Sequence, residues 1–114
     1  MKLIVTGGVE GRVVLIDPSA KIVTNHVKGH NTDILDVYFY DSHYQIVTIS
    51  SDRIVNIWNA NNLEIVQTIK DEMQQARSLS STCFDSWTGI FLTACIYVRI
   101  WKMKIDKAVE LKTL

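Results

Sequence analysis

Three residues of this chain carry the side chains that nucleophilic catalysis uses. Thr48 could supply a hydroxyl, His30 a general base, and Asp52 a carboxylate that orients the imidazole. A catalytic set of this type also needs an exposed nucleophile and donors that stabilise an oxyanion. The place of the three residues in the fold therefore decides between a catalytic and a structural role.

Other candidates for chemistry are weaker. The histidines and cysteines, which are His26, His30, His43, Cys83 and Cys95, do not show metal-ligand spacing. The apolar neighbours of the two cysteines predict buried thiols. Two cysteines do not make a disulfide framework, which fits a reducing compartment such as the cytoplasm. The glycine-rich stretch 7–11 lacks the Lys-Ser/Thr ending of a phosphate loop, so we predict a hairpin turn. We expect no catalytic, metal-binding or cofactor-binding site, and no cofactor.

Composition limits the class of partner. The chain has 114 residues, of which 47% are hydrophobic and 21% charged, so it can form a packed core. Its 12 basic and 12 acidic residues leave no net charge, which favours neither a nucleic acid nor an anionic membrane as partner. No apolar run approaches the roughly 18 residues of a membrane span, and no charged-then-apolar leader follows Met1. We expect a protein that is neither secreted nor membrane-bound.

The candidate residues lie among short segments rich in Ile, Val, Thr and Tyr, which predict strands. The predicted strands form sets of three, four and four: 3–6, 12–16 and 21–27; 34–40, 45–50, 54–58 and 63–69; 79–84, 90–94, 97–101 and 107–111. In 34–40, alternation predicts Ile34, Val37 and Phe39 in the core, with Tyr38 and Tyr40 on the other face. The segment 71–78 is predicted to be a long loop.

The sets repeat at a fixed period. Ile16 precedes Trp58 by 42 residues, and Trp58 precedes Trp101 by 43. A self-similar unit of about 40–45 residues with four short strands is typical of a β-propeller blade.

The middle set resembles a repeat of the WD-repeat family. Gly29-His30 opens it and Trp58-Asn59 comes near its end, with Asn59 where the family usually has Asp. The resemblance implies an all-β fold, a partial propeller of about three blades of antiparallel four-stranded sheet. Residues 1–28 would form an incomplete first blade, 29–70 a complete central blade, and 71–114 a degenerate third blade of the same domain.

The resemblance also implies a structural role for the three candidate residues. In this family a buried hydrogen-bond network joins a His, a Ser or Thr, an Asp and the Trp, which correspond here to His30, Thr48, Asp52 and Trp58. These residues thus match structural positions of the motif, so we reject the catalytic reading.

The flanking blades depart from this pattern. In the first, Thr6 and Glu10 match the hydroxyl and acid positions, but Ile16 replaces the Trp. In the third, counting back from Trp101 puts Phe91 and Cys95 at the hydroxyl and acid positions, whereas a shorter turn would keep Thr93 as the hydroxyl and leave no acid. We expect both flanking blades to depend mainly on apolar packing.

Three blades do not normally close a ring, since propellers have about four to eight. We therefore expect the chain to be part of a larger propeller whose remaining blades come from elsewhere or from further copies of the chain. Trp87 lies in a predicted loop, where it is either a partner contact or a lid over a blade edge.

Proteins of the WD-repeat family mostly serve as docking platforms, so we expect a non-enzymatic scaffold that binds other proteins in a multi-subunit complex. Ile4-Val5-Thr6-Gly7-Gly8 and Asn56-Ile57-Trp58-Asn59 are similar to parts of long WD-repeat proteins of cilia. That similarity implies axonemal or microtubule-associated partners. The alternative is a substrate-receptor or adaptor subunit of a ubiquitin ligase or another enzyme complex.

Overall fold

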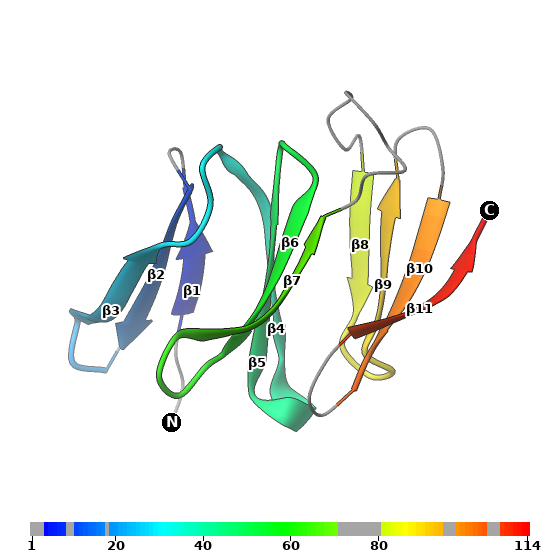
Figure 1. The fold of residues 1–114 in the computed structure, drawn as a ribbon. Coiled ribbons are helices and arrows are strands. Elements are labelled where there is room, and N and C mark those ends of the chain that lie inside the picture. The colour runs from blue at the N-terminus through cyan, green and yellow to red at the C-terminus, as the bar shows by residue number, and fades with distance from the viewer. Residues whose placement is uncertain (1–3, 9–10, 18, 71–80, 95–97, 105–107) are drawn as a thin grey trace.

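A computed structural model describes residues 4–8, 11–17, 19–70, 81–94, 98–104 and 108–114. These residues form three antiparallel sheets that stand side by side (Figure 1). The first blade contains β1 (Ile4–Gly7), β2 (Arg12–Asp17) and β3 (Ile22–Lys28). The middle blade contains β4 (Ile34–Tyr40), β5 (Gln45–Ser50), β6 (Ile54–Asn59) and β7 (Glu64–Lys70). The third blade contains β8 (Ser81–Asp85), β9 (Ile90–Ala94), β10 (Val98–Met103) and β11 (Ala108–Thr113).

The predicted all-β architecture of three, four and four strands is confirmed. The turn expected at residues 41–43 is a short 3-10 helix, Asp41–His43, that ends in the left-handed residue Tyr44. The loop predicted at 71–78 lies outside the described residues. No helix within the described part of the chain is long and apolar enough to cross a membrane.

Strand register makes the three blades equivalent position by position. Ile46 pairs with Trp58, Phe91 with Trp101, and Ile4 with Ile16. In each blade the pairing with the outermost strand shifts at the same place, just before Ile16, Trp58 or Trp101. Such bulges bend a strand and increase its twist, so all three outer strands are distorted in the same way.

The core of the described residues forms two clusters, one on each side of the middle blade. The first lies between the first and middle blades and contains Val13, Leu15, Ile46, Trp58, Ala60 and Leu63. The second lies between the middle and third blades and contains Tyr40, Val47, Ile49, Val55, Ile57, Phe91, Trp101, Met103 and Ala108. Blades therefore pack face to face, and the middle blade is buried on both faces.

The faces of β4 follow the predicted alternation. Ile34, Val37 and Phe39 pack against the first cluster. Tyr38 and Tyr40 lie on the opposite face, which is also covered, because they belong to or pack against the second cluster. The Tyr38 ring stacks on Phe84 of the third blade, with centroids 5.2 Å apart and planes 14° from parallel.

The first and middle blades are also joined through their connecting backbone. The N–H groups of Gly29 and His30 both donate to the Gly11 carbonyl, at 3.0 and 3.2 Å, and Ile34 N–H donates to the Gly8 carbonyl at 3.1 Å. Gly11 has φ +76°, and a Cβ there would collide with the His30 carbonyl. The glycine therefore allows the β1–β2 turn to approach the loop that carries His30.

Candidate functional site

The structure brings three of the four predicted network residues together. The Trp58 indole N–H donates to Thr48 Oγ1 at 2.8 Å, and the same hydroxyl lies 2.6 Å from His30 Nε2. The exposed fractions are 0% for Thr48, 2% for Trp58 and 4% for His30. The sheet sets this geometry, because Thr48 and Trp58 lie on adjacent strands β5 and β6, and the loop before β4 brings in His30.

Asp52 takes a different partner. Its carboxylate accepts a hydrogen bond from the Ser50 hydroxyl within the β5–β6 turn. Within the described contacts no hydrogen bond joins Asp52 to His30, and His30 Nδ1 has no hydrogen-bond partner. The carboxylate still acts on the imidazole through its charge, which raises the pKa of His30, while the larger effect of burial lowers that pKa below its ordinary value.

Asn56 belongs to this network and was missed from the sequence. Its Nδ2 donates to the Gly29 carbonyl at 2.8 Å and lies 3.4 Å from His30 Nε2, and its Oδ1 accepts from Thr68 at 2.8 Å. Since the Thr48 hydroxyl and the Asn56 amide both direct donors at Nε2, the network indicates a neutral imidazole with its proton on Nδ1. A polar residue two positions before the Trp, on the buried face of β6, was the available signal.

This arrangement does not suit nucleophilic catalysis. A nucleophile must reach substrate, whereas the Thr48 side chain is fully buried and its hydroxyl already accepts from Trp58. The same contacts suit a structural role, because they connect β5, β6 and the loop between the first and middle blades. We call this hydrogen-bond network of His30, Thr48, Asn56 and Trp58 the joint.

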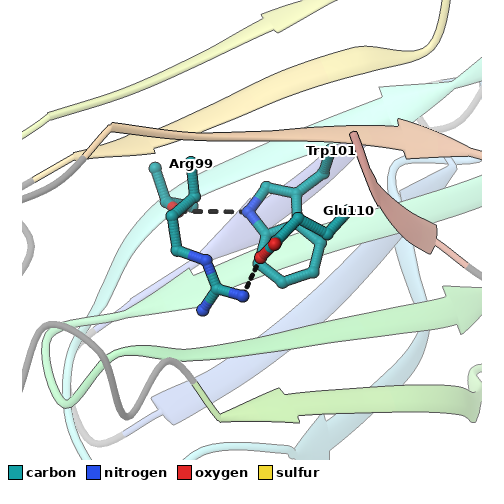
Figure 2. Close-up of polar contacts among 4 residues, drawn as sticks. Arg99, Trp101 and Glu110 are labelled. Atoms are coloured by element: carbon teal, nitrogen blue, oxygen red, sulfur yellow. Dashed lines mark hydrogen bonds and ion pairs between the residues drawn. The ribbon is translucent and has the colours of Figure 1, made fainter. Parts of the chain in front are cut away.

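The third blade repeats part of the joint. The Trp101 indole N–H donates to Thr93 Oγ1 at 3.2 Å, so Thr93 holds the hydroxyl position and the alternative with Phe91 is wrong. Arg99 occupies the position of Asn56. Its guanidinium lies 4.5 Å from the Trp101 ring centroid and forms an ion pair with Glu110 (Figure 2). Cys95, and Glu10 and the side chain of Thr6 in the first blade, lie outside what the structure describes.

The remaining predicted residues are dispersed. Cys83 is exposed, so the prediction that it is buried is wrong: its side chain points away from the face of β8 that packs on the middle blade. No group of three or more metal-ligating side chains occurs in the described ranges. Trp87 lies in the β8–β9 turn and is 91% exposed. A lid would bury its ring, so Trp87 does not cover a blade edge in the described structure.

Comparison with known proteins agrees with the fold. No protein-family model matches the chain. Pre-mRNA-processing factor 19 of Bos taurus is 30% identical over 77 residues, covering 68% of this chain and 15% of that protein. The Homo sapiens protein of the same name is 31% identical over 67 residues, covering 59% of this chain and 13% of that protein. The chain thus spans about a seventh of these curated relatives. A chain in the solved structure "Crystal Structure of Mitotic Checkpoint Complex" superposes with TM-score 0.78 at 15% identity, covering 98% of this chain and 35% of that one.

Proposed function

Because the chain belongs to the WD-repeat family, we propose that it acts as a non-enzymatic protein-interaction scaffold. In this proposal its three blades are part of a larger β-propeller within a multiprotein assembly. The similar propeller chain comes from a structure that is named as a complex, which supports a role of this kind. The blades supply rigid surfaces, since each sheet is fixed against its neighbour by the two core clusters.

The main observation that supports the proposal is the apolar outer face of the third blade. By register, Cys83, Leu92, Ala94, Val98 and Ile100 share this face, and they alternate with the residues that pack on the middle blade. None of them belongs to either core cluster of the described residues, and all remain at least partly exposed.

The equivalent face of the middle blade shows what such a surface does. The residues at the same register positions are Tyr38, Val47, Ile49, Val55 and Ile57. Every one of them lies in, or packs against, the cluster that the third blade covers. Contiguous apolar surface of this kind marks an interaction site. A further blade, or another protein, is therefore the partner that the outer face fits.

Solution behaviour tests the incomplete propeller. We expect the chain alone to associate as concentration rises in sedimentation velocity, and to bind a dye specific for apolar surface. Leu92→Glu should reduce both signals, whereas Val66→Glu, on the exposed outer strand of the middle blade, should reduce neither. A monodisperse monomer without dye binding would overturn the proposal that further blades cover this face.

Affinity capture with cross-linking from native extract tests the scaffold role. We expect protein partners whose cross-links map to the blades, and no catalytic turnover by the purified chain. We propose a cytoplasmic location, specifically at the ciliary axoneme. Tubulin and axonemal proteins among the partners would support this location. Cullin components would support the ubiquitin-ligase alternative. Turnover by the chain alone, or the absence of any cross-linked protein, would refute the scaffold role.

A further inference from the structure

The β8–β9 turn presents an exposed indole on a fixed backbone. The Asp85 carboxylate accepts from the Trp87 backbone N–H through Oδ1, at 3.0 Å, and from the Thr88 hydroxyl through Oδ2, at 2.8 Å. The Thr88 hydroxyl oxygen in turn accepts from Ile90 N–H at 3.3 Å. These contacts order the turn, yet the Trp87 side chain itself stays in solvent.

The base of the turn is anchored to two blades. Gly89 N–H donates to the Asp85 carbonyl at 2.9 Å, and the Gly89 carbonyl accepts from Met103 N–H at 2.7 Å. Gly89 has φ +70°, and a Cβ there would lie 2.7 Å from the Tyr40 ring of the middle blade. The turn therefore packs on the end of β4, while the Trp87 side chain at its tip is exposed.

The chemistry of the tip favours a cation. An indole face is the best aromatic surface for an ammonium or guanidinium group, and exposed Trp residues are enriched at binding hot spots. The hydrogen bond from Thr88 and that from the Trp87 backbone lower the pKa of Asp85, so its carboxylate is ionised at neutral pH. Each carboxylate oxygen can accept a further hydrogen bond.

We propose that the Trp87 ring and the Asp85 carboxylate together form a docking point for an Arg or Lys side chain of a partner protein. The inference deepens the proposed scaffold function and rests on it. The partner segment would be basic. An apolar segment would contact the Trp87 ring alone and would not interact with the charge of Asp85.

Nearby charges affect the strength of this site. Asp41 directly follows Tyr40, whose ring contacts Gly89, so a second carboxylate belongs to the same end of the molecule. Lys104 directly follows Met103, whose N–H binds the Gly89 carbonyl, so among the described residues an ammonium group also belongs to this end. Lys104→Gln should therefore tighten the binding of a cation at this end.

Indole resonances of the full chain give a direct test. Trp58 and Trp101 are buried, so Trp87 is the one indole that a ligand in solvent can contact at the surface. We expect titration with N-acetyl-arginine amide to shift the Trp87 indole N–H signal and leave the other two unchanged. N-acetyl-citrulline amide has nearly the same shape without the charge, and it should produce little shift. Equal shifts with both compounds would overturn the proposal.

Variants separate the charge from the ring. Asp85→Asn removes the charge and is expected to weaken arginine-amide binding about two- to fivefold, as for an exposed ion pair. Glu64→Gln, which removes an exposed carboxylate of the middle blade, should leave binding unchanged and serves as the matched control. An Asp85→Asn variant that binds as tightly as the original chain would also overturn the inference.

Capture with a Trp87→Ala variant distinguishes this inference from the scaffold role. Loss or weakening of a cross-linked partner in the variant, with the fold retained by circular dichroism, is the expected result. If the original chain captures partners and the variant captures all of them equally, the docking point is refuted and the scaffold role stands. If the original chain captures none, the scaffold role itself fails.

Discussion

Replacing Thr48 by Val is expected to lower the free energy of unfolding by about 2–4 kcal/mol. Valine has nearly the same shape as threonine, so the change leaves no cavity and isolates the hydroxyl. The Trp58 indole N–H loses its acceptor in a buried site, which costs about 1–3 kcal/mol. The lost bond to His30 contributes about 1 kcal/mol more.

Urea unfolding, followed by tryptophan fluorescence and far-UV circular dichroism, measures this loss. The slope of the free energy against urea concentration should stay constant, which shows that the variant still exposes the same surface on unfolding. A change in slope would mean that the fold itself has altered.

Thr93→Val is the matched control in the third blade. Thr93 accepts from Trp101 over a longer distance, 3.2 Å, and the preceding segment 71–80 contains no histidine. We expect a loss of about 1–2 kcal/mol there, which is smaller than at Thr48. Equal losses at the two sites, or a loss below about 1 kcal/mol at Thr48, would refute the reasoning that His30 adds to the middle blade.

Three further predictions concern the same joint and the β8–β9 turn. Burial lowers the pKa of His30, so the unfolded chain binds the proton more tightly than the folded one. The free energy of unfolding should therefore fall as pH drops below about 6.5. Denaturation across roughly pH 5–8, the range in which histidine titrates, should show a flatter pH dependence in His30→Gln. Asp52→Ala removes the acceptor of the Ser50 hydroxyl and the charge that raises the His30 pKa. We expect the free energy of unfolding in urea to fall by about 1–3 kcal/mol. NMR titration should show a still lower His30 pKa, and an unchanged pKa would contradict the electrostatic link between the two residues. Gly89→Ala places a Cβ at φ +70° against the Tyr40 ring; a loss of about 1–3 kcal/mol is expected, and unchanged melting would show that the turn does not pack on β4.

The strand order was predictable because each blade repeats one hydrophobic pattern at one period. Alternation in β4 correctly separated Phe39 from Tyr38. It could not show that both faces are covered, because a blade between two others is buried on either side. Burial of Cys83 was predicted wrongly, because the sequence does not show which face of a strand another blade covers. Apolar neighbours predicted burial, yet its face of β8 is the one with no described blade beyond it.

The polar contacts were harder to predict than the strands. Motif matching identified Thr48 and Trp58 because both are fixed by register on adjacent strands. It could not show that the Asp52 carboxylate binds Ser50, because a carboxylate in a turn has several donors within reach and the motif does not specify which one it binds. Arg99 and Glu110 were missed for another reason: they belong to different strands, and only the shifted register of β10 and β11 brings them together.

Register equivalence allows the polar contacts of the middle and third blades to be compared position by position among the described residues. Both Trp58 and Trp101 donate to a threonine on the adjacent strand, so the pair itself is a property of the repeat. Beside it, Asn56 reaches out to the Gly29 carbonyl in the loop between blades, whereas Arg99 pairs with Glu110 inside its own sheet. The first network therefore secures one blade to the next, while the Arg99–Glu110 pair joins two strands of one sheet. A histidine in such a joint serves by being neutral and buried, which is the opposite of what a general base requires.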